Sequence, residues 1–510
     1  MEPCVVMKFG GTSVQDAAAI RRLVEAVAAE PRPRVLVVSA LAGVTDALSD
    51  VADGRMSGAA AADVMSGLLE RHIAIVHELV TREAQPALIE RLRRRFEKAT
   101  RVASGVASGF LGSPKLGTSE GGSRKERHDA VLAVGELASS DVVAAVLDAA
   151  GVEASWVDAR HVIVTDAGFG HARPQPAAIR AAAARHLQPL LAVGRVPVLG
   201  GFIGADADGA TTTLGRGGSD YSAALLGAAI GAQEIQIWTD VDGVLTSDPR
   251  VVERATLVPE LSFHEAYELA RFGAKVLHWG TLEPAASHDI PVRVLNSRAR
   301  GGPGTTITGR SRRGAPSVVG LAQQGGVTVA DVRARGVTGS LRFLHAALDW
   351  LAHEHPGLNV VTLSAARLVV VAADEDAITQ LLAVLEDVAD TNVMRDAAIV
   401  TAVGDGITGH ADVWSVLTSA VRAGHVESVV AAHSGDALVC VTSRSLAPRV
   451  LARLHDRFFG LGSDPIHGST QGRVAARPDE LRWPGGPLER TASESIRERG
   501  LTPRTAGAVL

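Results

Sequence analysis

The 510-residue sequence contains only two cysteines, Cys4 and Cys440. Two thiols so far apart provide neither a disulfide framework nor a metal-ligand spacing, which excludes a disulfide-rich secreted scaffold and favours the reducing cytoplasm. No apolar run reaches the ~20 uninterrupted residues that span a bilayer. The N-terminus also lacks the basic region and apolar core of a signal peptide. We therefore expect a cytoplasmic protein without a membrane partner.

Lysine is scarce as well: five of the 51 basic residues are lysines. The formal net charge of −5 argues against nucleic acid as a partner. Where arginine is otherwise used, a retained lysine can mark a position that needs a compact point charge. Lys8 and Lys275 lie in motifs, whereas the other three lie in a charged helix or a polar loop and are expected to be solvated.

The most informative segment is residues 198–221, where an apolar strand leads into a glycine-rich turn and then a helix. Its glycines let the backbone approach an anion, and the following helix would direct free N–H groups towards it. Arg216 could bind a carboxylate through two hydrogen bonds, and Asp220 could orient an ammonium group or a metal. The pattern predicts a site for a phosphorylated ligand beside a small charged one. The alternative is a structural turn.

A second glycine-rich turn follows the expected strand Val5–Phe9. It is not a Walker loop, in which the lysine follows the last glycine, and it is not a GxGxxG dinucleotide turn. Lys8 precedes Gly10 and Gly11, so it should project from the strand end. Ligands of open α/β sheets lie at the carboxyl ends of strands, which would bring both turns to one crevice.

Short apolar strands alternate with helices from residue 1 to about 309. This alternation indicates a mainly parallel sheet with helices on both faces. The expected strands are residues 5–9, 35–39, 154–158, 196–199, 234–238 and 292–295, and the clearest helices are residues 177–188 and 220–230. Residues 103–128 are rich in glycine and serine and are expected to form a loop.

Residues 298–316 are expected to form a domain boundary. Two β-α-β-β-α units follow with a period of about 70 residues, which is close to the ferredoxin-like pattern. The first has strands at 327–332, 359–363 and 368–372 and helices at 341–354 and 376–388. The second has strands at 398–403, 427–431 and 437–442 and helices at 412–423 and 447–459. Residues 464–510 lose apolar periodicity, and a disordered tail is expected there.

Six motifs, in order, resemble those of the aspartate kinases, in the amino acid kinase superfamily. They are Lys8-Phe-Gly-Gly-Thr-Ser, Gly201-Phe-Ile-Gly, Thr211-Thr-Thr-Leu-Gly-Arg-Gly-Gly-Ser-Asp-Tyr, Trp238-Thr-Asp-Val-Asp-Gly-Val, Ser247-Asp-Pro-Arg and Phe272-Gly-Ala-Lys-Val-Leu-His. The resemblance implies an αβα sandwich with a mainly parallel sheet as the catalytic domain, residues 1–309. It also implies tandem βαββαβ ACT domains at 317–463, a homodimer or a dimer of dimers, and a possible regulatory amino acid at the ACT domains.

The resemblance further implies transfer of the γ-phosphoryl group of ATP, with Mg²⁺, to the β-carboxylate of L-aspartate, within lysine and threonine biosynthesis. Lys8 would bridge the transferring phosphate, Arg216 would hold the α-carboxylate, and Asp220 would organise Lys8 or the metal. Glu136 would bind the α-ammonium group. The remaining residues implied to line the aspartate pocket are Ala40, Thr45, Phe202 and Ser219.

The implied nucleotide site uses backbone amides and hydroxyls of both turns for the phosphates. These belong to Gly10, Gly11, Thr12, Ser13, Gly217 and Gly218. Thr239 and Asp240 would lie beside the adenosine, and Arg250 and Lys275 would reach the phosphates. No set of metal-ligating side chains is expected.

Three features depart from the family pattern. Trp279-Gly280 stands where the family usually has proline, and Leu245 stands where lysine-sensitive relatives often carry tyrosine. The turns at 336–342 and 431–435 differ from the usual effector-binding turns, so the ACT domains could serve dimerisation alone. Two alternatives follow: a paralogue of a specialised pathway that phosphorylates another amino acid or a related acceptor, or a non-enzymatic amino-acid sensor.

Overall fold

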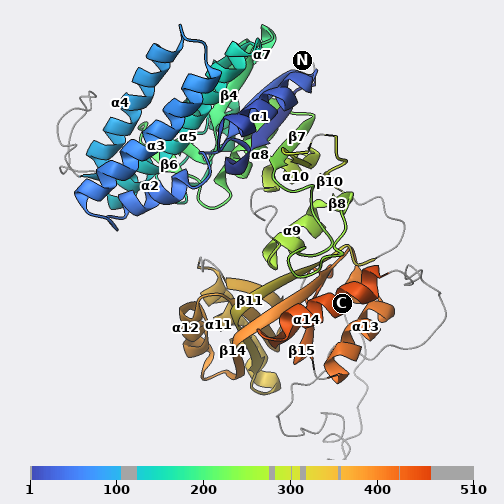
Figure 1. Cartoon of the computed structure of the whole chain (residues 1–510). Coiled ribbons are helices and arrows are strands. Elements are labelled where there is room, and N and C mark those ends of the chain that lie inside the picture. The colour runs from blue at the N-terminus through green and yellow to red at the C-terminus, as the bar shows by residue number, and fades with distance from the viewer. Residues whose placement is uncertain are drawn as a thin grey trace, which may run out of the picture.

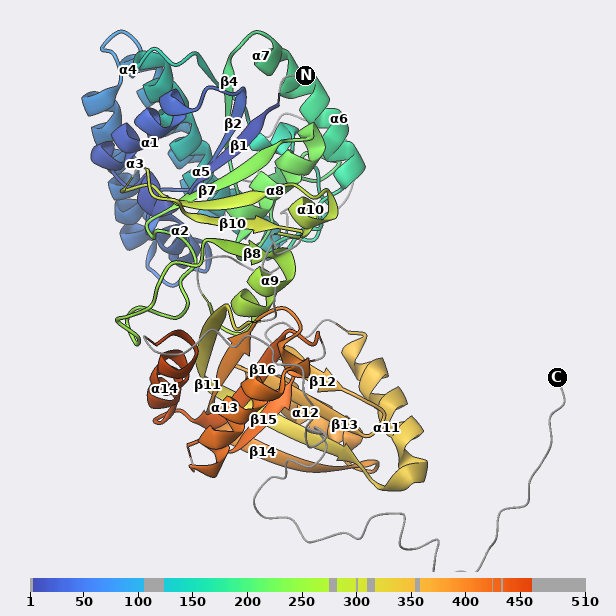
Figure 2. The same ribbon diagram turned by 90° about the vertical axis from the view of Figure 1, so that its right-hand side faces the viewer.

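The computed structural model describes residues 3–104, 123–274, 282–299, 301–309, 317–353, 358–423, 425–432 and 434–460, without the side chains of 337–339. Two lobes, each built around a sheet, lie one above the other (Figures 1 and 2). The first lobe comprises the described residues up to 309, and the second those from 317 to 460. The boundary expected at 298–316 lies only partly within the described residues and stays a prediction.

The first lobe contains an eight-stranded sheet in the order β3-β4-β2-β1-β7-β9-β10-β8. All neighbours are parallel except β9 and β10, which confirms the expected mainly parallel sheet. The short strands β8 and β10 at one edge carried no recognisable signal in the sequence. The strands are β1 (Val5–Phe9), β2 (Arg34–Val38), β3 (Ala154–Trp156), β4 (Val196–Gly200), β7 (Glu234–Thr239), β8 (Glu260–Ser262), β9 (Val292–Asn296) and β10 (Thr305–Thr308), with a separate hairpin of β5 (Ile203–Ala205) and β6 (Thr211–Thr213).

Helices cover both faces of this sheet because strand side chains alternate between them. Met7 and Phe9 of β1 pack into a core cluster with the first five helices, and Val6 packs into the opposite cluster with α6 and α8. The helical segments are η1 (Gly11–Ser13), α1 (Ala17–Ala29), α2 (Val44–Ala52), α3 (Gly58–Leu79), α4 (Gln85–Ala103), α5 (Arg124–Ala149), η2 (Ala159–His161), α6 (Pro176–His186), α7 (Gln188–Ala192), α8 (Gly218–Ile230), α9 (Phe263–Arg271) and α10 (Glu283–Ser287).

Helix α5 runs through the middle of the first lobe. Among the described residues it is the one helix long and apolar enough to cross a membrane, but 89% of its most apolar window is buried inside the protein. Such burial is typical of a core helix. Helix α5 contacts α2, α4, β3 and β4, and it therefore carries its polar side chains into the interior.

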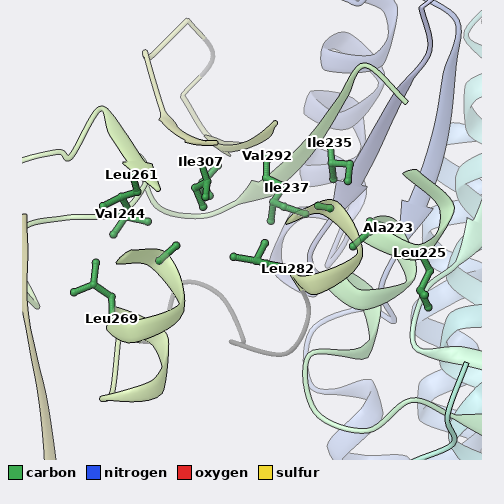
Figure 3. Close-up of a cluster of buried hydrophobic side chains, with 14 of the residues drawn as sticks. Ala223, Leu225, Ile235, Ile237, Val244, Leu261, Leu269, Leu282, Val292 and Ile307 are labelled. Carbon is green, nitrogen blue, oxygen red and sulfur yellow. The ribbon is translucent and has the colours of Figure 1, made fainter. Parts of the chain in front are cut away.

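An apolar cluster extends from the centre of the first sheet towards the second lobe (Figure 3). Ile235 and Ile237 of β7 lie in it, together with Leu282, the N-cap residue of α10. The cluster continues through Ile307 of β10 to Leu269 of α9. Helix α9 therefore shares its core with the sheet that ends at the predicted site.

The second lobe contains a six-stranded sheet in the order β12-β13-β11-β14-β16-β15. The order of elements along the chain is the expected pair of β-α-β-β-α units. The elements are β11 (Gly320–Ala334), α11 (Gly336–Leu351), β12 (Leu358–Leu363), β13 (Arg367–Ala372), α12 (Glu375–Leu385), β14 (Ala389–Val403), η4 (Ile407–Gly409), α13 (Ala411–Arg422), β15 (Ser428–Ala431), β16 (Ala437–Ser443) and α14 (Ala447–Phe459).

The two units are interleaved, which differs from the simple tandem order expected. Strands β11 and β14 are each 15 residues long and pair antiparallel along their length. Within β11, residues 328–333 are the part that pairs with β13, and within β14, residues 397–403 are the part that pairs with β16. The first module is therefore completed by the start of β14. The second module is completed by residues 320–325, which precede the first module in the chain.

The lobes are joined by polar contacts, several of which involve side chains of the first lobe. Helix α9, which lies between the sheets in Figure 2, provides most of them. They include His264 Nε2 to Asp436 Oδ2 at 3.0 Å, Asp405 N–H to Glu265 Oε1 at 3.2 Å, Arg271 to the Val360 carbonyl, and Thr246 Oγ1 to His455 Nε2 at 2.9 Å.

Candidate active site

Lys8 and Asp220 form an ion pair at the end of the central strand β1. Lys8 Nζ lies 2.5 Å from Asp220 Oδ1, and only 8% of Lys8 is exposed. Asp220 lies in the first turn of α8, where the helix dipole favours a carboxylate. The two glycine-rich segments therefore meet at the carboxyl ends of the parallel strands, as predicted from the positions of the two turns.

The loop after β1 packs closely against its neighbours. The Gly10 N–H donates to the Trp238 carbonyl at 3.1 Å, and a Cβ on Gly10 would lie 3.8 Å from Lys8 Nζ. A Cβ on Gly11 would lie 3.0 Å from the Ala40 carbonyl oxygen. The loop is therefore fixed to β7 and packs tightly against the Ala40 backbone at Gly11.

The Ser13 hydroxyl faces the interior, which does not fit the phosphate contact expected of its side chain. It donates to Ser297 Oγ at 2.8 Å, and the Ser297 hydroxyl donates to the Thr239 carbonyl at 2.9 Å. Ser13 is 2% exposed, whereas Thr12 is half-buried. The Ser13 hydroxyl ties η1 to the ends of β7 and β9, so we assign it a structural role.

Glu136 lies in the buried middle of α5 with one unpartnered oxygen. It is 2% exposed, and the Ala40 N–H donates to its Oε1 at 3.3 Å. Its Oε2 is buried and has no hydrogen-bond partner among the described residues. Burial raises the pKa of this carboxyl from 4.5 to about 8, against the smaller lowering by the Ala40 amide. A buried acceptor without a donor is costly, and an ammonium group would satisfy it.

Two consecutive glycines at the end of β4 bring α5 and α8 to this point. A Cβ on Gly200 would lie 2.8 Å from Glu136 Cβ, and a Cβ on Gly201 would lie 2.7 Å from Ser219 Cα. Both distances are shorter than real Cβ contacts allow. These glycines therefore let β4 approach both Glu136 and Ser219, which the family resemblance assigns to one pocket.

We expect Gly201→Ala to lower the free energy of unfolding by about 1–3 kcal/mol, because the new methyl group meets the Ser219 backbone, which cannot rotate away. Urea unfolding of both proteins measures the change. Gly67→Ala is the matched control: Gly67 is exposed in α3 with open space around it, so this change should stabilise the protein by roughly 0.5–1 kcal/mol. Equal stability of wild type and Gly201→Ala would contradict the tight packing.

Phe202 is held in a left-handed backbone conformation at the same turn, with φ 65°. A bulky residue rarely adopts this conformation. Its N–H donates to Ser222 Oγ at 2.9 Å, and a Cβ on Gly218 would lie 2.7 Å from Phe202 Cδ2. The Phe202 ring therefore packs against the start of α8, beside the predicted aspartate pocket.

Arg216 is exposed in the turn before α8 and has no ion-pair or hydrogen-bond partner within the described parts of the chain. Gly215 and Gly217 flank it with φ of 76° and 73°, and Gly217 is the N-cap of α8. The guanidinium is thus available for a ligand. On the other side of the site, Ala40 is buried and Thr45 is half-buried in the first turn of α2.

Asp129 is a site-organising residue that the sequence reasoning missed. It is fully buried in α5 and accepts from the Gly170 N–H at 2.8 Å and from the Thr213 N–H and hydroxyl at 2.9 Å. These bonds fix β6, which leads into the Arg216 turn. In the sequence, Asp129 follows charged residues in the stretch Arg127-His-Asp, which is typical of a solvated helix start. No local signal therefore marks Asp129 as a buried residue.

A cavity of about 580 Å³ opens beside the end of β7. Thr239, Asp240, Leu245 and Arg250 all line it, so the structure brings these nucleotide-side residues together. Arg250 is exposed and paired with Asp248 at 2.6 Å, and this partner also raises the pKa of the guanidinium. Lys275 and the Trp279-Gly280 pair lie outside the described residues.

Residues 3–296 match the model of the Amino acid kinase family. The lysine-sensitive aspartokinase 3 of Escherichia coli (strain K12) is 33% identical over 468 residues, covering 90% of this chain and 100% of that protein. The chloroplastic aspartokinase 1 of Arabidopsis thaliana is 32% identical over 418 residues, covering 78% of this chain and 70% of that protein.

Two solved structures resemble the fold over both lobes. The E. coli aspartokinase III in complex with aspartate and ADP, described as the R-state, has a TM-score of 0.76 at 32% identity. The same enzyme in complex with lysine and aspartate, described as the T-state, has a TM-score of 0.70 at 32% identity. Each comparison covers 89% of this chain and 99% of the other. This chain belongs to the aspartokinases of the amino acid kinase family.

Proposed function

We propose that this chain uses ATP to phosphorylate the β-carboxylate of L-aspartate, giving 4-phospho-L-aspartate. One observation supports placing this reaction at the site: in a chain that belongs to the aspartokinases, the buried Glu136 carboxyl has one oxygen without a partner among the described residues. A ligand ammonium group would supply the missing donor. L-Aspartate has this group, and the similar E. coli aspartokinase III was solved in complex with aspartate and ADP.

The proposed roles follow from charge. Glu136 binds the α-ammonium group and the exposed Arg216 binds the α-carboxylate, which leaves the β-carboxylate directed towards Lys8. Carboxylate and triphosphate repel each other, so the Lys8 ammonium lowers the barrier to their approach. Asp220, 2.5 Å from Lys8, holds that ammonium in place.

The reaction itself needs little covalent chemistry from the protein. One oxygen of the β-carboxylate forms a bond to the γ-phosphorus while the bond to the β,γ-bridging oxygen breaks, and ADP leaves. The nucleophile is already ionised, so no general base has to remove a proton. The chain supplies positioning and charge neutralisation, as in phosphoryl transfer generally.

Magnesium fits this site as an ion carried by the nucleotide. No group of three histidine, cysteine or acidic side chains with metal-binding geometry occurs among the described residues. Mg²⁺ in kinase sites is commonly held by phosphates, water and one or two carboxylates, and Asp220 is the candidate carboxylate. When bound, the ion neutralises charge on the phosphates.

We propose a regulatory role for the second lobe as a pair of ACT domains within residues 317–463. Its two interleaved βαββαβ modules and the lysine complex of the E. coli relative support an amino-acid effector. A homodimer or a dimer of dimers, a cytoplasmic location and a place in lysine and threonine biosynthesis stay predictions.

Hydroxylamine trapping with ATP, Mg²⁺ and L-aspartate tests the reaction directly, since an acyl phosphate reacts to give a hydroxamate. We expect aspartyl hydroxamate from wild type and none without ATP. Glutamate and other amino acids run in parallel test the alternative acceptor. Hydroxamate from another amino acid but not from aspartate would refute the proposed substrate.

The pKa of Glu136 predicts that aspartate binding tightens with pH. Below about pH 8 the carboxyl of the free site is protonated, so binding an ammonium group requires loss of a proton. We expect KM for aspartate to fall about tenfold between pH 7 and pH 9. Glu136→Gln should abolish this dependence, and an unchanged profile in that variant would contradict the assignment.

A further inference from the structure

The cavity beside β7 crosses from one lobe to the other. Thr239 and Asp240 of the first lobe form one side, and Leu321, Ala322 and Gln323 of β11 form part of another. The first strand of the second lobe is therefore a wall of the cavity to which we assigned the nucleotide.

This wall is fixed in position by backbone contacts. The Leu321 N–H donates to the Thr246 carbonyl at 2.8 Å. Gly273, with φ 114°, lies so close that its Cβ would be 2.5 Å from the Gln323 carbonyl oxygen. Strand β11 and the segment after α9 thus pack backbone to backbone at the cavity.

Two buried polar atoms of the cavity lining have no partner. Ser247 Oγ and Gln323 Oε1 are each buried and lack a hydrogen-bond partner among the described residues, and Ser247 is 5% exposed. Apolar side chains, including Val244, Leu245 and Leu269, make up much of the rest of the lining. An apolar pocket with a few neutral polar atoms suits a heteroaromatic ring.

The charged side chains of the cavity are more exposed. The Arg250 side chain is 69% exposed and that of Asp240 is 37% exposed. A ligand that enters with a neutral ring inside and its charged part at the rim fits this distribution. An amino-acid effector would instead need its two charges paired in the interior.

We propose that Gln323 is a specificity-determining residue that reads the adenine base of the nucleotide. A carboxamide accepts from the adenine amino group and donates to a neighbouring ring nitrogen, a pair that guanine does not offer in the same arrangement. Ser247 provides a second hydrogen bond to the base or sugar. The inference rests on the proposed nucleotide site and adds to it a residue from the second lobe.

Calorimetric titration of the full chain with ADP and GDP, without turnover, tests the proposal. We expect wild type to prefer ADP and Gln323→Leu to bind ADP about ten- to a hundredfold more weakly, with a smaller loss for GDP. Gln323→Glu keeps the shape of the side chain but removes the amide donor, so it should also lower the affinity for ADP. Gln324→Leu is the matched control, because the Gln324 Oε1 is likewise buried without a partner among the described residues, whereas Gln324 does not line the cavity.

Three outcomes would overturn the proposal: Gln323→Leu binding ADP like wild type, equal losses for ADP and GDP, or the same loss in Gln324→Leu. Steady-state kinetics gives an independent readout. Gln323→Leu should raise KM for ATP and leave KM for aspartate unchanged. If the chain bound ADP but did not phosphorylate aspartate, the proposed reaction would fail while the titrations still decided the role of Gln323.

Discussion

Lys8→Met is expected to lower kcat for aspartyl phosphate formation by about 10²–10³-fold. The ammonium group is held by Asp220 at 2.5 Å, so it is already oriented for the transferring phosphate before the substrates bind. Loss of this charge restores the repulsion between carboxylate and triphosphate in the transition state. The hydroxamate assay under saturating substrates measures kcat, and the thermal midpoint confirms that the variant is folded.

Lys8→Arg separates charge from shape. The guanidinium is planar and broader than the compact ammonium group, so it cannot place its charge at the Nζ position, 2.5 Å from Asp220 Oδ1. We expect kcat of this variant to fall nearly as much as that of Lys8→Met. Arginine occupies most basic positions of this chain, so its absence from position 8 is consistent with that expectation. Activity above a tenth of wild type in Lys8→Met would contradict the assigned role.

Glu136→Gln is expected to raise KM for aspartate about a hundredfold, because the variant leaves the α-ammonium group in a buried site without a countercharge. The same change should stabilise the ligand-free protein. A buried acid with a raised pKa binds more protons when folded than when unfolded between pH 4.5 and about 8, so wild type loses stability as the pH rises through this window.

The matched measurement is nucleotide affinity, which should not change in Glu136→Gln. Chemical denaturation at pH 5 and pH 8 tests stability, with the larger gain expected at pH 8. A variant with a normal KM for aspartate, or one that is less stable than wild type at pH 8, would refute the described role of Glu136.

Local sequence patterns were sufficient to predict most strands of the first sheet. They also predicted that the segments carrying Lys8 and Asp220 lie close together. Apolar runs identified β1 and β7, and the rule that ligands lie at strand ends brought the two glycine-rich turns together. Glu136 was different: its position on a helix could not show that both oxygens are buried. Its environment depends on Gly200 and Ala40, which are distant in the chain and approach only in the fold.

Long-range pairings explain the remaining differences. The resemblance implied that Ser13 gives an amide or a hydroxyl to phosphate, but the hydroxyl bonds to Ser297, at the far end of the first lobe's sequence. The interleaving of the second lobe rests on pairs such as Gly320 with Val403, for which neither segment carries a local signature. Gln323 likewise acquires its proposed role only because β11 reaches the first lobe.

The division of β11 between two modules has a consequence for synthesis of the chain. Residues 320–325 leave the ribosome before any of the first module, yet their partners at 397–403 follow only after that module has been made. During synthesis, residues 320–325 therefore stay unpaired after residues 328–333 of the same strand can already pair with β13. Closure of the second module is a late, non-local event, and non-local strand pairings slow folding. A cut between the halves of β11 would leave the first module with its own strands and deprive the second of one of its four.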